Sequence, residues 1–254
     1  MKLLSVPNFR AIGGYPTRDG RIVRSDRLYR SSHLGRLSPT DRKRLDAAGI
    51  RTVFDLRNQR DIRTEGQLFI PSGARLLHLN AFGDSVASDL RPVLMSSDRR
   101  KQEEVLGAGR AEGLMSIALV QLALGRTAVF STLLTYLSEK NCLPAIVHCS
   151  AGKDRTGWAA SIVLLALDVD EKYVLEHYLL SNECRRAEVE SSLAQLSRYI
   201  DGNLVRPLLE VRPQYLLSAF RAITKRFGTY DAYLTKMLKF DADHRQRLRA
   251  NFLQ

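Results

Sequence analysis

One stretch of this chain combines residue types that can bind a phosphate group and attack its phosphorus. Residues 145 to 157 read Ala-Ile-Val-His-Cys-Ser-Ala-Gly-Lys-Asp-Arg-Thr-Gly. The β-branched run before His148 and Cys149 predicts a short strand, and the apolar run after Thr156 predicts a buried helix. A loop between a strand and a helix N-terminus offers an anion several backbone N–H groups and the positive end of the helix dipole.

Two residues of this loop would carry the chemistry. Cysteine attacks as the thiolate, which a helix N-terminus and nearby cations favour, and Cys149 stands where the predicted strand ends. Arg155 follows six residues later, and its planar guanidinium suits two phosphate oxygens. The arrangement predicts transfer of a phosphoryl group to sulfur, followed by hydrolysis of the phosphocysteine. The residues expected to surround the phosphate are Ser150, Ala151, Gly152, Lys153 and Thr156.

The structural alternative is a buried cysteine before an ordinary strand-to-helix turn, because cysteine often serves as a small apolar residue. That alternative does not account for Lys153, Asp154 and Arg155 in succession beside it. Gly152 fits the catalytic interpretation, since a tightly curled loop needs a residue without a Cβ atom. Thr156 fits it as well, because its hydroxyl can donate a hydrogen bond to the leaving thiolate.

The composition suits one domain of 254 residues, with 44% hydrophobic residues for a sizeable core. The net charge is +12, and 30 of the 39 basic residues are Arg. A basic surface attracts nucleic acid, acidic lipid headgroups and phosphorylated ligands alike, so charge does not choose among them. The sequence lacks an obvious platform of aromatic residues interleaved with basic ones, so we expect no nucleic-acid partner.

The three cysteines, Cys142, Cys149 and Cys184, include no Cys-x-x-Cys pair. The sequence therefore predicts neither a disulfide framework nor a zinc site, and it implies no metal or cofactor. A free thiol suits a reduced compartment, so we expect a cytoplasmic protein, or one exported without an N-terminal signal peptide. The apolar runs are too short to span a bilayer, and at most peripheral membrane contact is expected.

Strand patterns alternate with helical patterns early in the chain, and helical patterns dominate late. We expect strands at 22–23, 28–29, 51–56, 75–79 and 145–148. We expect helices at 38–49, 98–106, 114–124, 127–140 and 156–167, and further helices after 170 with breaks at Gly202, Pro207, Pro213 and Gly228. This order predicts an α/β core with a helical C-terminal region.

The stretch from His148 to Gly157 resembles the signature of the cysteine-dependent protein tyrosine phosphatases. Its Gly-Lys-Asp-Arg-Thr form is similar to a bacterial and fungal branch, which includes a mycobacterial phosphatase that acts on phosphotyrosine and phosphoinositides. Ala11 departs from this branch, which usually has Asp there. The similarity extends to the segments 8–15, 28–32, 54–57, 178–182 and 227–234.

The resemblance implies the cysteine-dependent phosphatase fold, with a mostly parallel central sheet flanked by helices. It implies a single phosphatase domain over residues 1–254. It also allows a helical lid at 81–124, where the apolar periodicity is weak up to residue 113. The alternative for that segment is an ordinary surface insertion.

The leaving oxygen needs a proton, which a positioned carboxylic acid usually supplies. Many tyrosine phosphatases use an Asp on a mobile Trp-Pro-Asp loop, but the single Trp of this chain, Trp158, lies in a predicted helix. The resemblance implies this role for Asp154, against the alternative of a carboxylate that only stabilises the helix N-terminus. The further candidates, in order, are Asp55 and then Asp84 and Asp89. For Asp55 the alternative is a structural pair with an Arg, and His148 is expected to orient the loop through a hydrogen bond.

Lys153 and Arg57 would extend the site toward a second phosphate. In the resembling branch this lysine accompanies activity on phosphoinositides, and Arg57 would help if its strand ends beside the loop. The alternative for Arg57 is a surface or structural ion pair. The sequence thus predicts a phosphatase for phosphotyrosine, extended to phosphoserine, phosphothreonine and phosphoinositides. Two other interpretations are a non-catalytic module that holds phosphorylated ligands in the same basic pocket, and a nucleic-acid binder.

Overall fold

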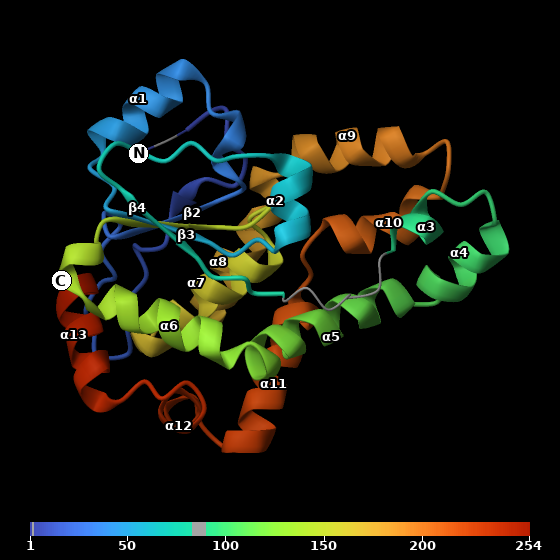
Figure 1. Ribbon diagram of the computed structural model, residues 1–254. Coiled ribbons are helices and arrows are strands. Elements are labelled where there is room, and N and C mark those ends of the chain that lie inside the picture. The colour runs from blue at the N-terminus through green and yellow to red at the C-terminus, as the bar shows by residue number, and fades with distance from the viewer. Residues whose placement is uncertain (2, 83–89) are drawn as a thin grey trace.

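A five-stranded sheet lies at the centre of the computed structural model, which describes residues 1, 3–82 and 90–254 (Figure 1). Its strands are β1 (Arg10–Ala11), β2 (Leu28–Ser31), β3 (Thr52–Asp55), β4 (Arg75–His78) and β5 (Ala145–His148). The order in the sheet is β1-β2-β5-β3-β4, with β1 antiparallel to β2 and the other pairs parallel. The predicted α/β fold with a mostly parallel sheet is confirmed. The strand expected at 22–23 is reduced to isolated bridges.

Helices flank this sheet and extend beyond it to one side (Figure 1). Those before β5 are α1 (Pro39–Ala47), α2 (Gln59–Glu65), α3 (Arg91–Leu94), α4 (Arg99–Leu106), α5 (Arg110–Gly125) and α6 (Thr127–Ser138). Those after β5 are α7 (Asp154–Ala166), α8 (Glu171–Cys184), α9 (Arg186–Leu196), α10 (Gly202–Leu209), α11 (Pro213–Phe227), α12 (Tyr230–Lys236) and α13 (Ala242–Phe252). Short 3-10 turns lie at Leu34–Arg36 and Lys140–Cys142.

Side chains of the central strands alternate between two apolar cores, as the pleat of a strand requires. Phe54 and Val147 belong to the larger core, which includes residues of α5, α6, α7, α8 and α11. Their chain neighbours Val53 and Ile146 belong to a smaller core with α1 and the N-terminal segment. Because β5 is buried on both faces, its first three residues, Ala145, Ile146 and Val147, are all apolar.

Helix α7 is the most buried helix against the sheet. Every residue from Thr156 to Ala166 is buried, and the ring of Trp158 packs edge-on against Phe130 of α6. The buried helix expected at 156–167 is therefore confirmed. It begins two residues earlier, at Asp154, because the last residues of the preceding loop already form its first turn.

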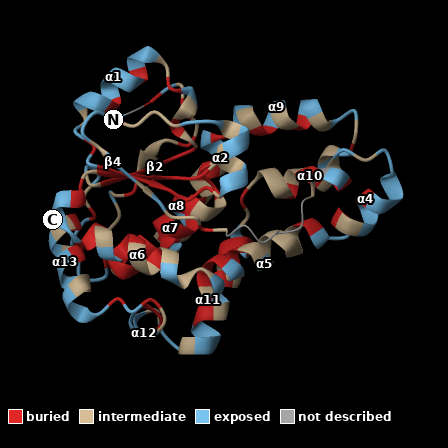
Figure 2. Ribbon diagram, viewed as in Figure 1, coloured by how far each residue is buried: buried red, intermediate tan, exposed pale blue. Residues whose placement is uncertain are grey.

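A third apolar core joins α3, α4, α9 and α10 into a lobe beside the sheet, at the right in Figures 1 and 2. Helix α5 connects this lobe to the rest of the molecule. Its residue Ala111 lies in the third core, whereas Leu119 lies in the largest core. The expected charged helix is α4, and the Asp98 side chain caps its N-terminus. Residues 83–89 of the expected lid lie outside the described residues.

Other local signals had mixed outcomes. Ser38 caps α1 as expected, because its side chain accepts a hydrogen bond from the Asp41 N–H at 3.2 Å. The break expected at Pro207 is wrong, since this residue lies inside α10. An interior proline removes one backbone donor and crowds the carbonyl four residues earlier, but α10 continues for two residues beyond the buried Pro207. Among the described residues no single helix could span a bilayer, although α4 and α5 pass that test as a pair bent by 47°.

Candidate active site

The register of the sheet brings three strand ends level beside the Cys149 loop, residues 149–155. His148, the last residue of β5, lies between Ser31 at the end of β2 and Asp55 at the end of β3. All three strands run parallel, so the segments that follow them leave the same edge of the sheet. Ligands of parallel sheets bind at this carboxyl edge. The segments 28–32 and 54–57 therefore flank the loop from its two sides.

Cys149 and Gly152 define the base of this loop. Cys149 is 2% exposed and belongs to the largest apolar core, directly after the central strand. Gly152 has a φ of +67°, and a Cβ atom there would lie 2.3 Å from the Ser31 carbonyl oxygen. Only glycine fits this close approach of two backbones. The loop is thus pressed onto the end of β2.

Arg155 reaches back over the loop from the first turn of α7. Its Nη2 donates to the Ser150 hydroxyl at 3.2 Å, and its Nη1 donates to the Asp61 carboxylate. The Phe82 ring lies on one face of the guanidinium, 5.3 Å away. Burial lowers the pKa of Arg155, but the charges of Cys149 and Asp61 outweigh burial and raise it. A fixed cation therefore lies beside the cysteine.

Lys153 is buried, and its ammonium is directed at the end of α10. The Nζ donates to the carbonyl oxygens of Leu208 and Glu210, the latter at 3.1 Å, and lies 3.5 Å from the Asp154 carboxylate. Burial lowers the pKa of Lys153, and Asp154 partly offsets this effect. The helix C-terminus suits a cation, because its carbonyl groups carry partial negative charge. Lys153 thus connects the loop to the helical lobe.

Asp154 is the one proton-donor candidate that belongs to the loop itself. Its side chain is 20% exposed, and its Oδ1 is buried with no hydrogen-bond partner among the described residues. This oxygen is available to a ligand. Asp84 and Asp89, the weaker candidates, lie outside the described residues.

Asp55 and Arg57 form a buried ion pair beside the loop. The Arg57 Nη2 lies 3.0 Å from the Asp55 carboxylate, and its Nη1 lies 3.1 Å from that of Glu65. Burial raises the pKa of Asp55, but His148 and the Arg57 hydrogen bonds outweigh burial and lower it. The Arg57 side chain is only 1% exposed, so its contacts fit the alternative of a structural ion pair.

His148 and Thr156 are both buried next to the loop. Burial lowers the pKa of His148 to about 4, so its imidazole is neutral near pH 7. Its Nδ1 lies 3.2 Å from the Cys149 carbonyl oxygen, a position that suits the expected orienting hydrogen bond. The Thr156 hydroxyl has no partner among the described residues and remains available as a donor.

Three residues at this site were not identified from the sequence: Asp61, Asn8 and Arg30. Asp61 holds Arg155, and it also accepts a hydrogen bond from the Asn58 N–H in the capping box of α2. The Asn58-x-x-Asp61 spacing after a strand was an available sign of a helix start, and α2 was missed with it. Asn8 and Arg30 contact the loop carbonyls, and no sequence signal other than the family resemblance of their segments pointed to either side chain.

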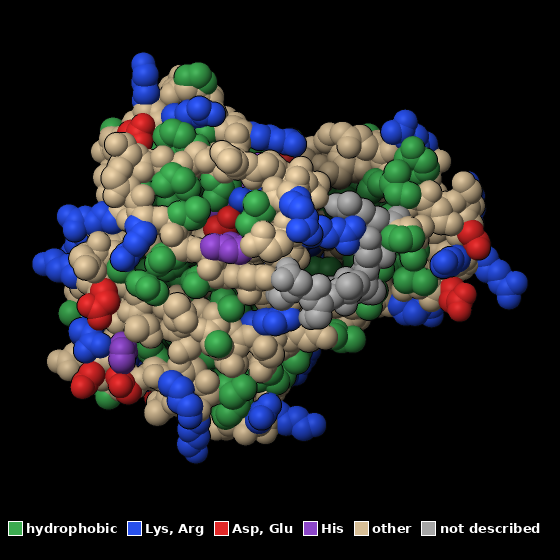
Figure 3. Space-filling view, viewed as in Figure 1, with side chains coloured by type: hydrophobic (Ala, Val, Ile, Leu, Met, Phe, Trp, Pro, Cys, Tyr) green, Lys and Arg blue, Asp and Glu red, His purple; other side chains and the backbone are tan. Residues whose placement is uncertain are grey.

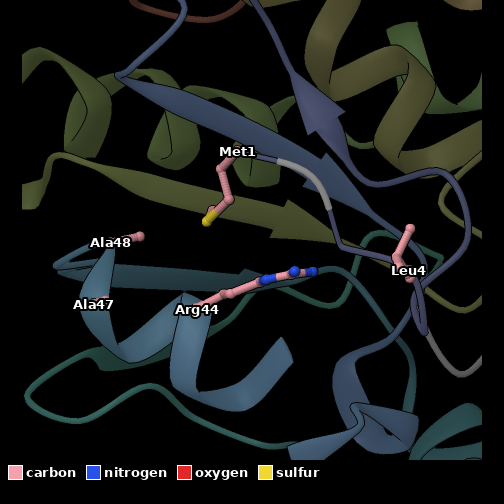
Figure 4. A pocket seen from close by; sticks show the side chains of 5 residues that line it. All are labelled: Met1, Leu4, Arg44, Ala47 and Ala48. Atoms are coloured by element: carbon pink, nitrogen blue, oxygen red, sulfur yellow. The ribbon is translucent and has the colours of Figure 1, made fainter. Parts of the chain in front are cut away.

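An apolar cavity of about 880 Å³ adjoins the loop. Asp154, Phe82 and Arg126 line it together with apolar residues of α5 such as Leu114 and Met115. A second hollow, of about 650 Å³, lies away from the loop, between α1 and the N-terminus (Figure 4). Among the described residues no group of His, Cys, Asp and Glu could hold a metal ion. Basic side chains are spread across the face in Figure 3 rather than gathered in one patch.

Comparisons with known proteins identify the family of this chain. The model of the tyrosine phosphatase family matches residues 1–254, so the chain belongs to that family. The chain is 31% identical to the "Putative tyrosine-protein phosphatase" of Cupriavidus necator, over 98% of this chain and 86% of that protein. It is 28% identical to the "Triple specificity protein phosphatase PtpB" of Mycobacterium tuberculosis, over 89% of this chain and 90% of that protein. The predicted family is confirmed.

The contact between Asp61 and Arg155 leads to a prediction. Asp61→Asn keeps an acceptor for the Asn58 N–H and removes the charge that holds Arg155. A hydrogen bond to a charged group contributes about 1.5–3 kcal/mol, so kcat/KM for an aryl phosphate should fall about tenfold or more. Glu112→Gln is a matched control, because it breaks a similar pair with Arg212 away from the loop. Equal kcat/KM values in the two variants would remove Asp61 from this role.

Proposed function

We propose that this phosphatase hydrolyses phosphotyrosine through a phosphocysteine on Cys149. One observation carries the proposal: the Arg155 guanidinium is fixed beside Cys149 by Asp61, Ser150 and the Phe82 ring. The Nε and the remaining N–H groups of Arg155 face no other described carboxylate. They suit the oxygens of a phosphate that lies over the sulfur.

The proposed reaction has two steps at one phosphorus atom. The Cys149 thiolate attacks phosphorus, the bond to the tyrosine oxygen breaks, and Asp154 protonates that oxygen. Water then attacks the phosphocysteine and gives a proton to the Asp154 carboxylate, while the sulfur leaves as a thiolate. The unpartnered Oδ1 of Asp154 supports this role, whereas the Asp55 carboxylate is engaged by Arg57. The free Thr156 hydroxyl would stabilise the departing thiolate.

The nucleophile is tested with Cys149→Ser, assayed on phenyl phosphate without added metal. We expect activity at the uncatalysed background, because the Cys149 loop would favour ionisation of a thiol but would leave a serine hydroxyl protonated. Cys142→Ser is the matched control, since Cys142 is also buried but lies outside the loop, against Arg75. Activity of Cys149→Ser equal to that of the control would end the phosphocysteine proposal.

The general acid is tested with Asp154→Asn on two aryl phosphates. Loss of a general acid lowers the rate about 10²- to 10⁴-fold when the leaving group is basic. The comparison uses kcat/KM, because this constant reports the first step alone, whereas hydrolysis of the phosphocysteine is common to both substrates. We therefore expect a large loss of kcat/KM on phenyl phosphate and a much smaller loss on 4-nitrophenyl phosphate, whose leaving group needs little protonation. The decline of kcat/KM for phenyl phosphate as the pH rises, which reports deprotonation of the general acid, should also disappear. Equal losses on both substrates would point to another acid, with Asp55→Asn the next variant.

A broader substrate range is the second part of the proposal. We propose activity on phosphoserine, phosphothreonine and phosphoinositides. The name of the mycobacterial relative, a triple specificity phosphatase, supports a range beyond phosphotyrosine. The apolar cavity of about 880 Å³ next to Asp154 supports it as well, because it leaves room for a bulky leaving group.

Lys153→Met distinguishes two ways in which Lys153 could support activity on lipids. Its ammonium could contact a headgroup phosphate directly, or it could hold the Cys149 loop against α10. The ammonium is bound to α10 carbonyls, so contact with a second headgroup phosphate would require these hydrogen bonds to break. We expect similar losses of kcat/KM on a phosphotyrosine peptide and on a phosphoinositide, since the variant releases the loop from α10. A loss confined to the lipid would instead indicate direct contact with the headgroup.

A further inference from the structure

The backbone carbonyl groups of the Cys149 loop accept hydrogen bonds from two segments near the N-terminus. One segment contains Asn8, and the other contains Arg30 and His33. The His33 N–H donates to the Ser150 carbonyl oxygen at 3.0 Å. The Asn8 Nδ2 donates to the Gly152 carbonyl oxygen at 2.7 Å and lies 3.5 Å from that of Ala151. The Arg30 Nη2 donates to the same Gly152 oxygen at 2.5 Å and lies 3.4 Å from the next one along the chain. Four consecutive carbonyl groups thus face β1, β2 and their flanking turns.

This arrangement fixes the direction of the loop N–H groups. In a planar trans peptide the C=O bond and the following N–H bond point to opposite sides. When the carbonyls of residues 150–153 face the N-terminal segments, the N–H groups of residues 151–154 face away from them. None of these four N–H groups donates a hydrogen bond to another described residue. Backbone donors of this kind require a partner, and an anion over the cysteine provides one.

Arg30 places a positively charged side chain in the protein interior, next to the carbonyl groups of the Cys149 loop. It is fully buried, and no carboxylate among the described residues forms an ion pair with it. Its Nε and Nη1 also lack hydrogen-bond partners there. Burial and the neighbouring Arg10 hold the pKa of Arg30 well below its ordinary value. A buried cation without an anion is costly, and a bound phosphate nearby would offset part of that cost.

Asn8 is held in place from its other end. The Arg10 Nη1 donates to the Asn8 Oδ1, and Arg10 is anchored in turn by the His177 carbonyl oxygen at 2.8 Å. Because Oδ1 accepts from Arg10, the amide NH₂ group of Asn8 must face the loop. Asn8 has a φ of +63°, a conformation that Asn and Asp tolerate better than most residues.

We propose that Asn8 and Arg30 are positioning residues that turn the N–H groups of the Cys149 loop toward the substrate phosphate. The proposal rests on the proposed function of the loop, and it concerns how the phosphate cradle is built. Neither side chain contacts the phosphate. Both act through the Gly152 carbonyl, whose orientation decides where the next N–H points.

Asn8→Asp tests this with little change in shape. Asp keeps an oxygen for Arg10 and tolerates the positive φ, but it replaces the donor to the Gly152 oxygen with a second acceptor. The dissociation constant of inorganic phosphate, measured by calorimetry, should rise at least about tenfold, and KM for phenyl phosphate should rise with it. Arg30→Met should have a similar effect, and Arg30→Lys should recover part of it.

Gln102→Glu is the matched control. The Gln102 amide is buried and donates to the carbonyls of Val93, Ser96 and Tyr199 in the helical lobe. The variant therefore makes the same change of donor to acceptor away from the loop. Its melting temperature should fall as much as that of Asn8→Asp, while its affinity for inorganic phosphate stays at the wild-type value.

A backbone readout distinguishes positioning from general loss of stability. Inorganic phosphate should shift the amide resonances of residues 151–154 in the wild type and much less in Asn8→Asp. Wild-type phosphate affinity in both Asn8→Asp and Arg30→Met would overturn the proposal. Since phosphate binding needs no turnover, the result stays readable even if Cys149→Ser keeps its activity, an outcome that would overturn only the phosphocysteine mechanism.

Discussion

The alignment of three parallel strand ends is the constraint on which the site depends. Ser31, His148 and Asp55 lie side by side across β2, β5 and β3. A loop that leaves the central strand therefore has a neighbouring segment on each side. The segment after β2 receives its carbonyl groups, and the segment after β3 leads to α2, which supplies Asp61. A shift of one residue in either pairing would turn every side chain of the shifted strand to the opposite face and separate these partners.

Four largely buried cations lie around this loop, and each has a different kind of partner. Arg57 is paired with two carboxylates, and Lys153 is bound to the C-terminal carbonyls of a helix. Arg155 has one carboxylate and an aromatic ring, which leaves part of its guanidinium open. Among the described residues, the partners of Arg30 are backbone carbonyl and hydroxyl oxygens. The two cations with incomplete partners, Arg155 and Arg30, both contact the Cys149 loop, and this suits the phosphate-binding role proposed for that loop.

The helical lobe is connected to the chemistry through two contacts. Helix α5 belongs to both the lobe core and the main core, so the lobe is not packed as a separate body. Lys153 adds a polar connection from the loop to the end of α10. The apolar cavity lies between these contacts and opens beside Asp154. In the proposed reaction, a leaving group with an apolar body would contact the lobe while its phosphate contacts the loop.

The sequence by itself determined the parts of this protein whose physics is local. A β-branched run, a glycine-containing loop and an apolar helix predict strand, anion loop and buried helix, and the order of elements predicts an α/β fold. Cys149, Arg155 and Asp154 followed from their spacing and from the family resemblance. Tertiary structure alone decided what each charged group contacts. Asn8, Arg30 and Asp61 are distant from the loop in sequence, and their roles arise from strand register. The directions of Lys153 and Arg57 depend on partners elsewhere in the chain, because a charged side chain is placed by the groups that compensate its burial.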